Sequence, residues 1–335
     1  MNAPRLTFYC ELANAPLQAL FAQEDVIPAL RGLEASVSLG LLDLSPERAA
    51  VVKRLNQAGI PLVAWLLLPP EQGYWFNVDN AAEAAARYQA FRDWTAEHGL
   101  RWARVGLDIE PDIRQLRQLA GRPWRLALTL LGRALDDGRL RAAQTRYRAL
   151  VAQIRADGYA VDSYHFPFIL DERQARSTVL QRWAGLVDFP ADREVLMLYS
   201  SFLRPHGPGV LWNYAMGAQS VGLGNTGGGV DTSGLIEQQY LNWDEFVRDL
   251  RLAACQCDDL HIFSLEGCVA QGFLERLQDF DWDGPVRLPL ADARRVGRWR
   301  RAARLGLWAA SRPWLFLLLA LGLAGAWAYL RRIKR

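Results

Sequence analysis

Two carboxylic acids stand two positions apart at the end of an apolar run in the sequence VGLDIEP, residues 105–111. Asp108 and Glu110 alternate with Leu107 and Ile109, and alternate side chains of a β-strand point to the same face. Acids on one face repel each other when both are ionised, so their pKa values separate and one acid stays protonated near neutral pH. The spacing therefore favours general acid–base chemistry, with a solvated turn after a strand as the alternative.

Further acids and aromatic side chains follow the other apolar runs of the chain. Tyr199 lies near the end of the sixth run and is a further candidate catalytic residue. The residues expected to bind substrate are Glu11, Glu71, Tyr74, Trp75, His165, Asn225 and Glu266. Carboxylates and flat rings around one site suit a saccharide, because carboxylates transfer protons and rings stack on sugar faces. No second histidine lies at ligand spacing from His165, so no metal site is expected.

Eight β-rich runs supply the elements that must position these residues. The runs cover residues 6–12, 36–44, 60–69, 101–110, 160–168, 194–202, 220–227 and 260–267, with helical stretches between them. Helices are expected to start at Ser45-Pro46-Glu47 and to cover residues 80–99, 112–157 and 269–279. Eight alternating units imply an α/β fold, a (β/α)8 TIM barrel whose C-terminal strand ends carry the active site. A doubly wound open sheet is the alternative.

The composition divides the chain into four parts. Residues 1–290 are expected to form the barrel domain, 291–312 a basic juxtamembrane linker, 313–330 a transmembrane helix and 331–335 a basic tail. The third part is apolar and uncharged, and at about 1.5 Å per residue it spans most of a hydrocarbon core of about 30 Å. Trp and Tyr near its ends suit the headgroup zone. This predicts a single-pass membrane protein with a C-terminal anchor, a buried core helix being the alternative.

Basic residues are concentrated beside this apolar segment, although the formal net charge of the chain is only +3. Seven arginines and no acid lie between residues 294 and 312, and four basic residues follow residue 330. Positive flanks mark the cytoplasmic side, and the N-terminus lacks the features of a signal peptide, so we expect a cytoplasmic barrel. Membrane lipids are expected partners of the C-terminal helix and basic linker. The remaining sequence has no basic excess, which argues against nucleic acid as a partner.

The glycine-rich run GLGNTGGG, residues 222–229, fits a dinucleotide fingerprint only by its spacing. That fingerprint needs a helix that starts within the run, whereas residues 230–233 show no clear helix start. No cofactor is therefore expected. A flexible loop and a phosphate-binding loop after the seventh strand remain as alternatives. The four cysteines are expected to be buried free thiols in a reducing compartment.

The residues GLDIEP, followed two strands later by MLYSS, resemble the chitinase-like barrels of glycoside hydrolase family 18. In that family a D-x-D-x-E pattern ends the fourth strand and M-x-Y-D lies on the sixth. The resemblance implies that Glu110 is the general acid, that Asp108 orients an N-acetyl group of the substrate and that Tyr199 steadies this group. Gly106 and Ser200 stand at the two other acid positions of the pattern. The tetrapeptide LDIE is also similar to the acid-bearing strand of family 25 lysozymes.

Three hypotheses about function follow. The first is a membrane-anchored glycoside hydrolase-like barrel that acts on an envelope saccharide or glycolipid, with Glu71 or Glu266 as nucleophile or base where no N-acetyl group takes part. The second is a catalytically silent barrel that binds a saccharide or serves as a scaffold, which Gly106 favours. The third is a barrel enzyme for a phosphorylated or lipid-headgroup substrate that uses the glycine-rich run.

Overall fold

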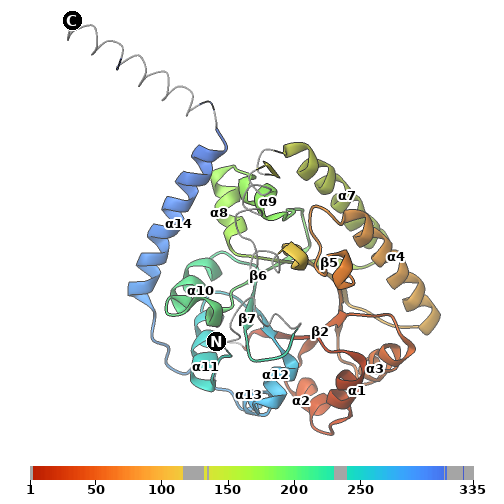
Figure 1. Cartoon of the computed structure of the whole chain (residues 1–335). Coiled ribbons are helices and arrows are strands. Elements are labelled where there is room, and N and C mark those ends of the chain that lie inside the picture. Colours follow the sequence, from red (N-terminus) through yellow and green to blue (C-terminus); the bar gives the residue numbers. More distant parts are fainter. Residues whose placement is uncertain are drawn as a thin grey trace, which may run out of the picture.

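Eight parallel strands close into one barrel in the computed structural model of the chain (Figure 1). The structure describes residues 3–115, 132–133, 136–229, 240–312, 314 and 327. In chain order the strands are β1 (Arg5–Cys10), β2 (Ser36–Leu41), β3 (Leu62–Leu66), β4 (Arg104–Asp108), β5 (Ala160–His165), β6 (Arg193–Met197), β7 (Ser220–Gly224) and β8 (Asp259–Phe263). Each strand pairs with the next, and β8 pairs with β1. The eight predicted strands and the (β/α)8 class are confirmed.

Helices surround the barrel and connect its strands (Figure 1). They are α1 (Asn14–Ala22), α2 (Val26–Gly32), α3 (Pro46–Gln57), α4 (Ala81–His98), α7 (Asp137–Ala156), α8 (Phe168–Ala175), α9 (Val179–Ala184), α10 (Gly207–Ala215), α11 (Trp243–Ala254), α12 (Leu265–Ala270), α13 (Phe273–Gln278) and α14 (Leu290–Ala310), with 3-10 turns η1 (Pro70–Gln72) and η2 (Ser200–Leu203). The predicted helical region 112–157 is described in part, and α7 occupies its second half.

Strand side chains alternate between the barrel interior and the layer beneath the helices. On β4, Val105 and Leu107 are fully buried in the layer between strands and helices. The opposite faces of the strands carry an aromatic cluster inside the barrel, in which the ring of Trp65 contacts those of Tyr9 and Tyr164 edge-on. The two faces of β4 therefore have the orientation that its sequence predicts.

Capping residues fix where several helices begin and end. Ser45 accepts a hydrogen bond from the amide of Arg48 at the predicted start of α3. A reciprocal capping box starts α11, in which the side chains of Asn242 and Glu245 each accept from the other's backbone amide. Gly99 ends α4 in the left-handed conformation, with φ of +63°. The first two caps set where α3 and α11 begin, and Gly99 ends α4 before the chain enters β4.

The C-terminal part of the described chain differs from the predicted organisation. The sequence predicts one helix over residues 269–279, whereas the structure has two short ones, α12 and α13. Residues 291–312 are predicted to be a linker, whereas most of them form α14, which packs on α10 and α8 (Figure 1). This segment contains no proline before residue 313 and is rich in Ala, Leu and Arg, which favour helix.

The predicted transmembrane helix, residues 313–330, and the basic tail, residues 331–335, fall outside the described residues except at positions 314 and 327. Within the part of the chain that is described, no helix is both long enough and apolar enough to cross a membrane.

Candidate functional site

The acid pair lies at the C-terminal end of β4. Asp108 is the last residue of the strand and is buried, whereas Glu110 follows Ile109 and keeps part of its surface exposed. The amide of Glu110 donates to the carbonyl of Phe76, 3.2 Å away, and Phe76 forms an isolated parallel bridge with Ile109. These contacts continue the strand pairing past β4, so both carboxyl groups stay on the inward face.

Asp108 is buried inside the barrel beside Trp65. The indole Nε1 of Trp65 donates to Oδ2 of Asp108 at 3.1 Å, whereas Oδ1 has no hydrogen-bond partner among the described residues. Burial raises the pKa of Asp108 well above its ordinary range, and the charges of Glu110 and Glu11 raise it further. Because a buried polar atom without a partner is costly, Oδ1 is a candidate contact for a bound ligand.

Glu110 is suited to hold a proton at neutral pH. Burial raises its pKa to about 8, and the negative charge of Glu11 adds to the shift. Asp108 and Glu110 lie close enough to interact, so the ionisation of one raises the pKa of the other. A carboxyl group that is protonated near pH 7 is what general acid catalysis requires.

Glu11 faces this pair from the end of β1. It follows the last residue of the strand, and its Oε1 accepts a hydrogen bond of 2.5 Å from the hydroxyl of Tyr74. Burial, together with the charge of Glu11, raises the pKa of Tyr74, so the phenol stays protonated and remains a donor. Tyr74 therefore fixes the position of the Glu11 carboxyl group.

Tyr74 reaches Glu11 from a strained backbone conformation. Its φ is +65°, in the left-handed region that residues other than glycine rarely adopt. The carbonyl of Tyr74 accepts from the amide of Leu68 at 2.8 Å, which holds this turn on the end of β3. The ring of Trp75 meets that of Tyr74 edge-on at 5.2 Å. Both predicted aromatic residues are thus buried at the mouth end of the barrel.

Tyr199 and Phe263 extend the aromatic surface beside the acids. Their ring centroids are 5.8 Å apart, and Phe263 lies 6.1 Å from Tyr9. Burial raises the pKa of Tyr199, and the charges of Asp108 and Glu110 contribute, so its hydroxyl stays a donor. Sequence reasoning missed Phe263, although the alternation of β8 was the signal that could have placed its ring inside.

Glu266 reaches the acids from a helix rather than from β8. The strand ends at Phe263, and Ser264 caps α12 by accepting from the amide of Gly267. Glu266 lies in the first turn of this helix, where its Oε1 accepts from the amide of Glu11 at 3.2 Å. Its Oε2 has no partner in the described part of the protein, and burial raises its pKa. The predicted residue is at the site, but its element differs.

The glycine-rich run passes directly over these acids. A Cβ at Gly228 would lie 2.4 Å from the side chain of Glu266. A Cβ at Gly229 would lie 2.6 Å from the ring of Phe263 and 3.0 Å from Oε2 of Glu11. Both glycines also have positive φ. Any side chain at either position would collide with the acid group, so close approach explains the glycines.

Asn225 shapes the same run. It is buried at the start of the loop after β7, where its side-chain oxygen accepts from the amide of Gly227 at 3.0 Å. Its own amide donates to the hydroxyl of Ser201 at 3.3 Å. These contacts give Asn225 a structural role in holding the loop beside the acids.

Two of the predicted site residues lie apart from this group. Glu71 is exposed on η1. His165 is buried on the outer face of β5, because its neighbour Tyr164 takes the inward position and side chains alternate. The ring of His165 lies 6.0 Å from that of Phe189, in the layer beneath the helices. The structure therefore differs from the expectation that His165 reaches the barrel mouth.

His165 has two acidic neighbours outside the barrel. One ligand atom from each of His165, Asp188 and Glu194 lies within 4.8 Å of the others. Arg173 already pairs with both acids, at 2.6 Å from Asp188 and 2.5 Å from Glu194. A metal ion would have to displace this guanidinium, so we assign no metal role to the group.

The two positions that lack the acids of the family 18 pattern are filled by other contacts. A Cβ at Gly106 would lie 2.5 Å from the hydroxyl of Tyr164, so Tyr164 occupies the space that an acid there would need. The hydroxyl of Ser200 donates to Asp249, a buried carboxylate of α11. The inward face of β4 therefore holds two acids and has no room for a third.

The chain resembles known proteins in fold alone. No protein-family model and no curated protein sequence matches it. Among solved structures, the glycoside hydrolase domain of PgaB (BpsB) from Bordetella bronchiseptica has a TM-score of 0.48 and 11% identity, over 83% of this chain and 98% of that one. An L-ribulose 3-epimerase has a TM-score of 0.40 and 13% identity, over 94% of this chain and 98% of that one. The mannanase catalytic domain of Streptomyces sp. SirexAA-E has a TM-score of 0.40 and 13% identity, over 86% of this chain and 88% of that one.

Proposed function

We propose that the protein is a glycoside hydrolase-like barrel that acts on a glycosidic bond of an envelope saccharide or glycolipid. One observation carries the proposal: Glu110, whose pKa burial raises to about 8, shares the mouth of the barrel with a second carboxyl group, Glu11, that the hydroxyl of Tyr74 holds in place. Cleavage of a glycosidic bond needs such a pair, one acid to protonate the leaving oxygen and one carboxylate to act on the other side of the sugar.

The roles follow from the environment of each group. Glu110 is the proton donor. Glu11 is the base or nucleophile, a role that the sequence assigns to Glu71 or Glu266. Asp108, whose Oδ1 is free of partners within the described residues, contacts the substrate together with the hydroxyl of Tyr199.

The charge around the glycine-rich run favours a sugar over a phosphorylated substrate. Gly228 and Gly229 lie against Glu266 and Glu11, so a phosphate bound by their amides would meet two carboxyl groups. Like charges at short range are unfavourable in a partly buried site. Sugar hydroxyls, in contrast, donate hydrogen bonds to carboxylates. A headgroup or phosphorylated substrate is therefore the weaker alternative.

The C-terminal sequence supports a location at a membrane. Residues 313–330 are proposed to anchor the chain in a membrane, with the barrel on the cytoplasmic side, because seven arginines precede the apolar segment and four basic residues follow it. An anchored cytoplasmic barrel would meet lipid-linked saccharides rather than exported polymers.

A panel of chromogenic glycosides and natural saccharides tests the proposal. The full chain is used, because α14 packs on the barrel. Glu110→Gln keeps the shape of the side chain and is expected to lower turnover by about 10²–10⁴-fold, the usual contribution of a general acid. Glu71→Gln, an exposed acid on η1, is the matched control and is expected to retain activity. Equal turnover in Glu110→Gln and the parent protein would reject the proposal.

A catalytically silent barrel is the second candidate, favoured by the missing third acid at Gly106. It predicts saccharide binding without turnover, and binding that survives Glu110→Gln. Calorimetry with the same saccharides separates it from the enzyme.

A further inference from the structure

One face of α14 is fastened to the barrel. Arg300 pairs with Asp171 of α8 at 3.0 Å, and its guanidinium lies 3.8 Å from the centre of the Tyr214 ring of α10. Val296, one turn earlier, is 2% exposed. Asp292 contacts the ring of His206 at 2.8 Å. This face is therefore committed to intramolecular contacts.

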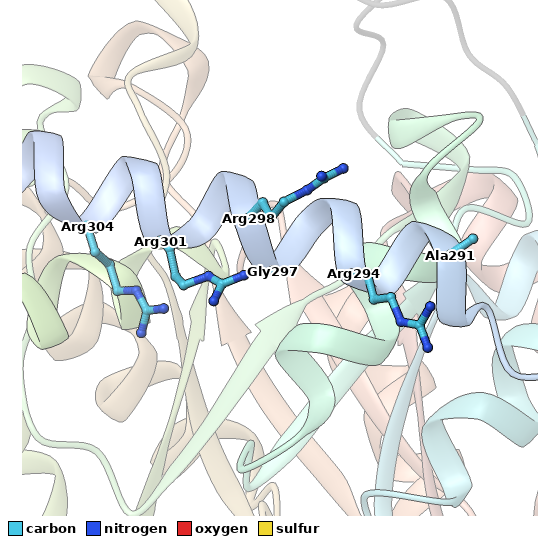
Figure 2. A pocket seen from close by; sticks show the side chains of 6 residues that line it. All are labelled: Ala291, Arg294, Gly297, Arg298, Arg301 and Arg304. Atoms are coloured by element: carbon cyan, nitrogen blue, oxygen red, sulfur yellow. The ribbon is translucent and has the colours of Figure 1, made fainter.

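A second face of the same helix carries arginines without such contacts. Arg294, Arg298 and Arg301, here called the arginine face, are exposed and form no ion pair with any described acid. Their spacing of four and three residues places them along one side of a helix. An open groove of about 610 Å³ is lined by Ala291, Arg294, Gly297, Arg298, Arg301 and Arg304. Figure 2 shows the side chains of Arg294 and Arg301 extending downward from α14 and that of Arg298 extending upward.

Apolar side chains continue this face toward the C-terminal end of α14. Leu305 is 69% exposed and Trp308 is 44% exposed, and helical spacing places both on the side that carries the arginines. The sequence then passes into the apolar residues 313–330. A helix that combines arginines with exposed Trp and Leu is suited to the interface of a bilayer, where rings enter the headgroup zone and cations meet phosphates.

We propose that the arginine face of α14 binds the phosphate groups of anionic membrane lipids and so fixes the orientation of the barrel on the membrane surface. Guanidinium groups form paired hydrogen bonds with phosphate oxygens, which favours arginine over lysine for this role. Leu305 distinguishes this surface from one built for a soluble polyanion, since its exposed aliphatic side chain neither pairs with phosphate nor stacks on bases, whereas it can enter a bilayer. The choice of a lipid partner rests on the proposed membrane anchor and not on the chemistry of Glu110.

Arginine footprinting tests this surface directly. The full chain is placed in nanodiscs of phosphatidylcholine alone or with phosphatidylglycerol, treated with phenylglyoxal and mapped by mass spectrometry. Co-elution of the chain with the discs reports the anchor separately, and vesicles of the same two compositions replace the discs if the chain does not enter them. In anionic lipid, modification of Arg294, Arg298 and Arg301 is expected to slow severalfold. Exposed arginines on other helices, Arg31, Arg54 and Arg146, are expected to react equally in both lipids.

The alternative outcomes each overturn the proposal. No protection in anionic lipid means that the face does not contact phosphate. Equal protection in both lipids means that the anchor alone brings the helix near the surface. Protection by inorganic phosphate or by RNA, in discs of phosphatidylcholine, means a site for soluble anions.

A variant set gives a second readout. The full chain is purified in nonionic detergent with equal amounts of the two lipids, and the retained lipid is counted by mass spectrometry. The variant Arg294→Gln/Arg298→Gln/Arg301→Gln is expected to lose the preference for phosphatidylglycerol, with about a fivefold effect for each arginine removed. The control Arg31→Gln/Arg54→Gln/Arg146→Gln is expected to keep it. Equal lipid retention by both variants would exclude the arginine face.

Discussion

The hydroxyl of Tyr164 fills the space into which a side chain at position 106 would project. A Cβ added at Gly106 would lie 2.5 Å from that hydroxyl and 2.9 Å from the ring carbon that bears it, and the hydroxyl itself contacts Ser38 at 2.8 Å. This pair explains why glycine precedes Asp108 on the inward face of β4, where the acids are confined to Asp108 and Glu110.

Gly106→Ala is expected to destabilise the barrel, because the added methyl group overlaps a fully buried ring. Overpacking of this kind costs about 1–3 kcal/mol. Guanidinium unfolding of the parent, Gly106→Ala, Tyr164→Phe and the double variant measures it. Removing the hydroxyl relieves the closest overlap, so the double variant should lose less stability than the two single losses together. Strict additivity would mean that the two residues do not meet.

The pKa of Glu110, raised from its ordinary 4.5 to about 8, predicts both activity and stability as functions of pH. Turnover should fall above about pH 8 as the general acid loses its proton. The folded chain binds this proton more tightly than the unfolded chain, so the contribution of Glu110 is fully present below about pH 4.5 and is lost as pH rises through 8.

Glu110→Gln should therefore become more stable than the parent protein as pH rises between these values. One unit of pKa corresponds to about 1.4 kcal/mol, and partial exposure of Glu110 reduces the effect, so we expect a gain of about 2–3 kcal/mol. Unfolding midpoints measured at pH 5 and pH 8.5 give this difference. A parent-to-variant difference that is the same at both pH values would contradict the raised pKa.

Tyr74→Phe keeps the ring and removes the donor to Glu11. Hydrogen bonds to charged groups contribute about 1.5–3 kcal/mol, so kcat/KM should fall by about tenfold or more if Glu11 acts on the substrate. Tyr88→Phe is the matched control, since Tyr88 donates to Asp157 at 2.7 Å on the outside of the barrel. The control should lose stability and retain activity. Similar activities in the two variants would remove Glu11 from the mechanism.

An ion-pair network packs the opposite, N-terminal end of the barrel. Arg193 pairs with the buried Asp162 and, at 3.0 Å, with Asp259. Arg193→Met removes the guanidinium that two buried carboxylates share, while Asp162 keeps Arg104 and Asp259 keeps the hydroxyl of Ser220, so we expect a cost of about 3 kcal/mol. Arg155→Met, which removes a half-exposed pair with Asp192, is expected to cost less than about 1 kcal/mol. Comparable losses in chemical unfolding would show that the network is no more important than a surface pair.

The sequence predicts those features of the fold that depend on local pattern. Alternation on β4 places Asp108 and Glu110 on the inward face, and the cap at Ser45 marks a helix start, because neither depends on distant residues. The contact between Glu11 and Tyr74 joins residues 63 positions apart, and nothing local predicts it. The same holds for α14, whose Arg300 meets an acid 129 residues earlier in the chain.

Two predicted site positions depend on how far a strand continues. At His165 the chain keeps the strand period, so the side chain faces outward although the residue lies near the mouth. At Glu266 the strand has already ended at Phe263, and the helix that follows turns the carboxyl group toward the site.

The ion pair between Arg300 and Asp171 limits how far the barrel could move from the proposed membrane anchor. A flexible tether of the length of residues 291–312 would let the domain wander on the order of 25 Å. Because α14 packs on α8 and α10, these residues do not act as a flexible tether. If residues 313–330 enter a bilayer as proposed, the mouth of the barrel is held at one height and one tilt. The barrel would then accept only those substrates whose glycosidic bond lies at a fixed distance from the lipid surface, whatever the sugar.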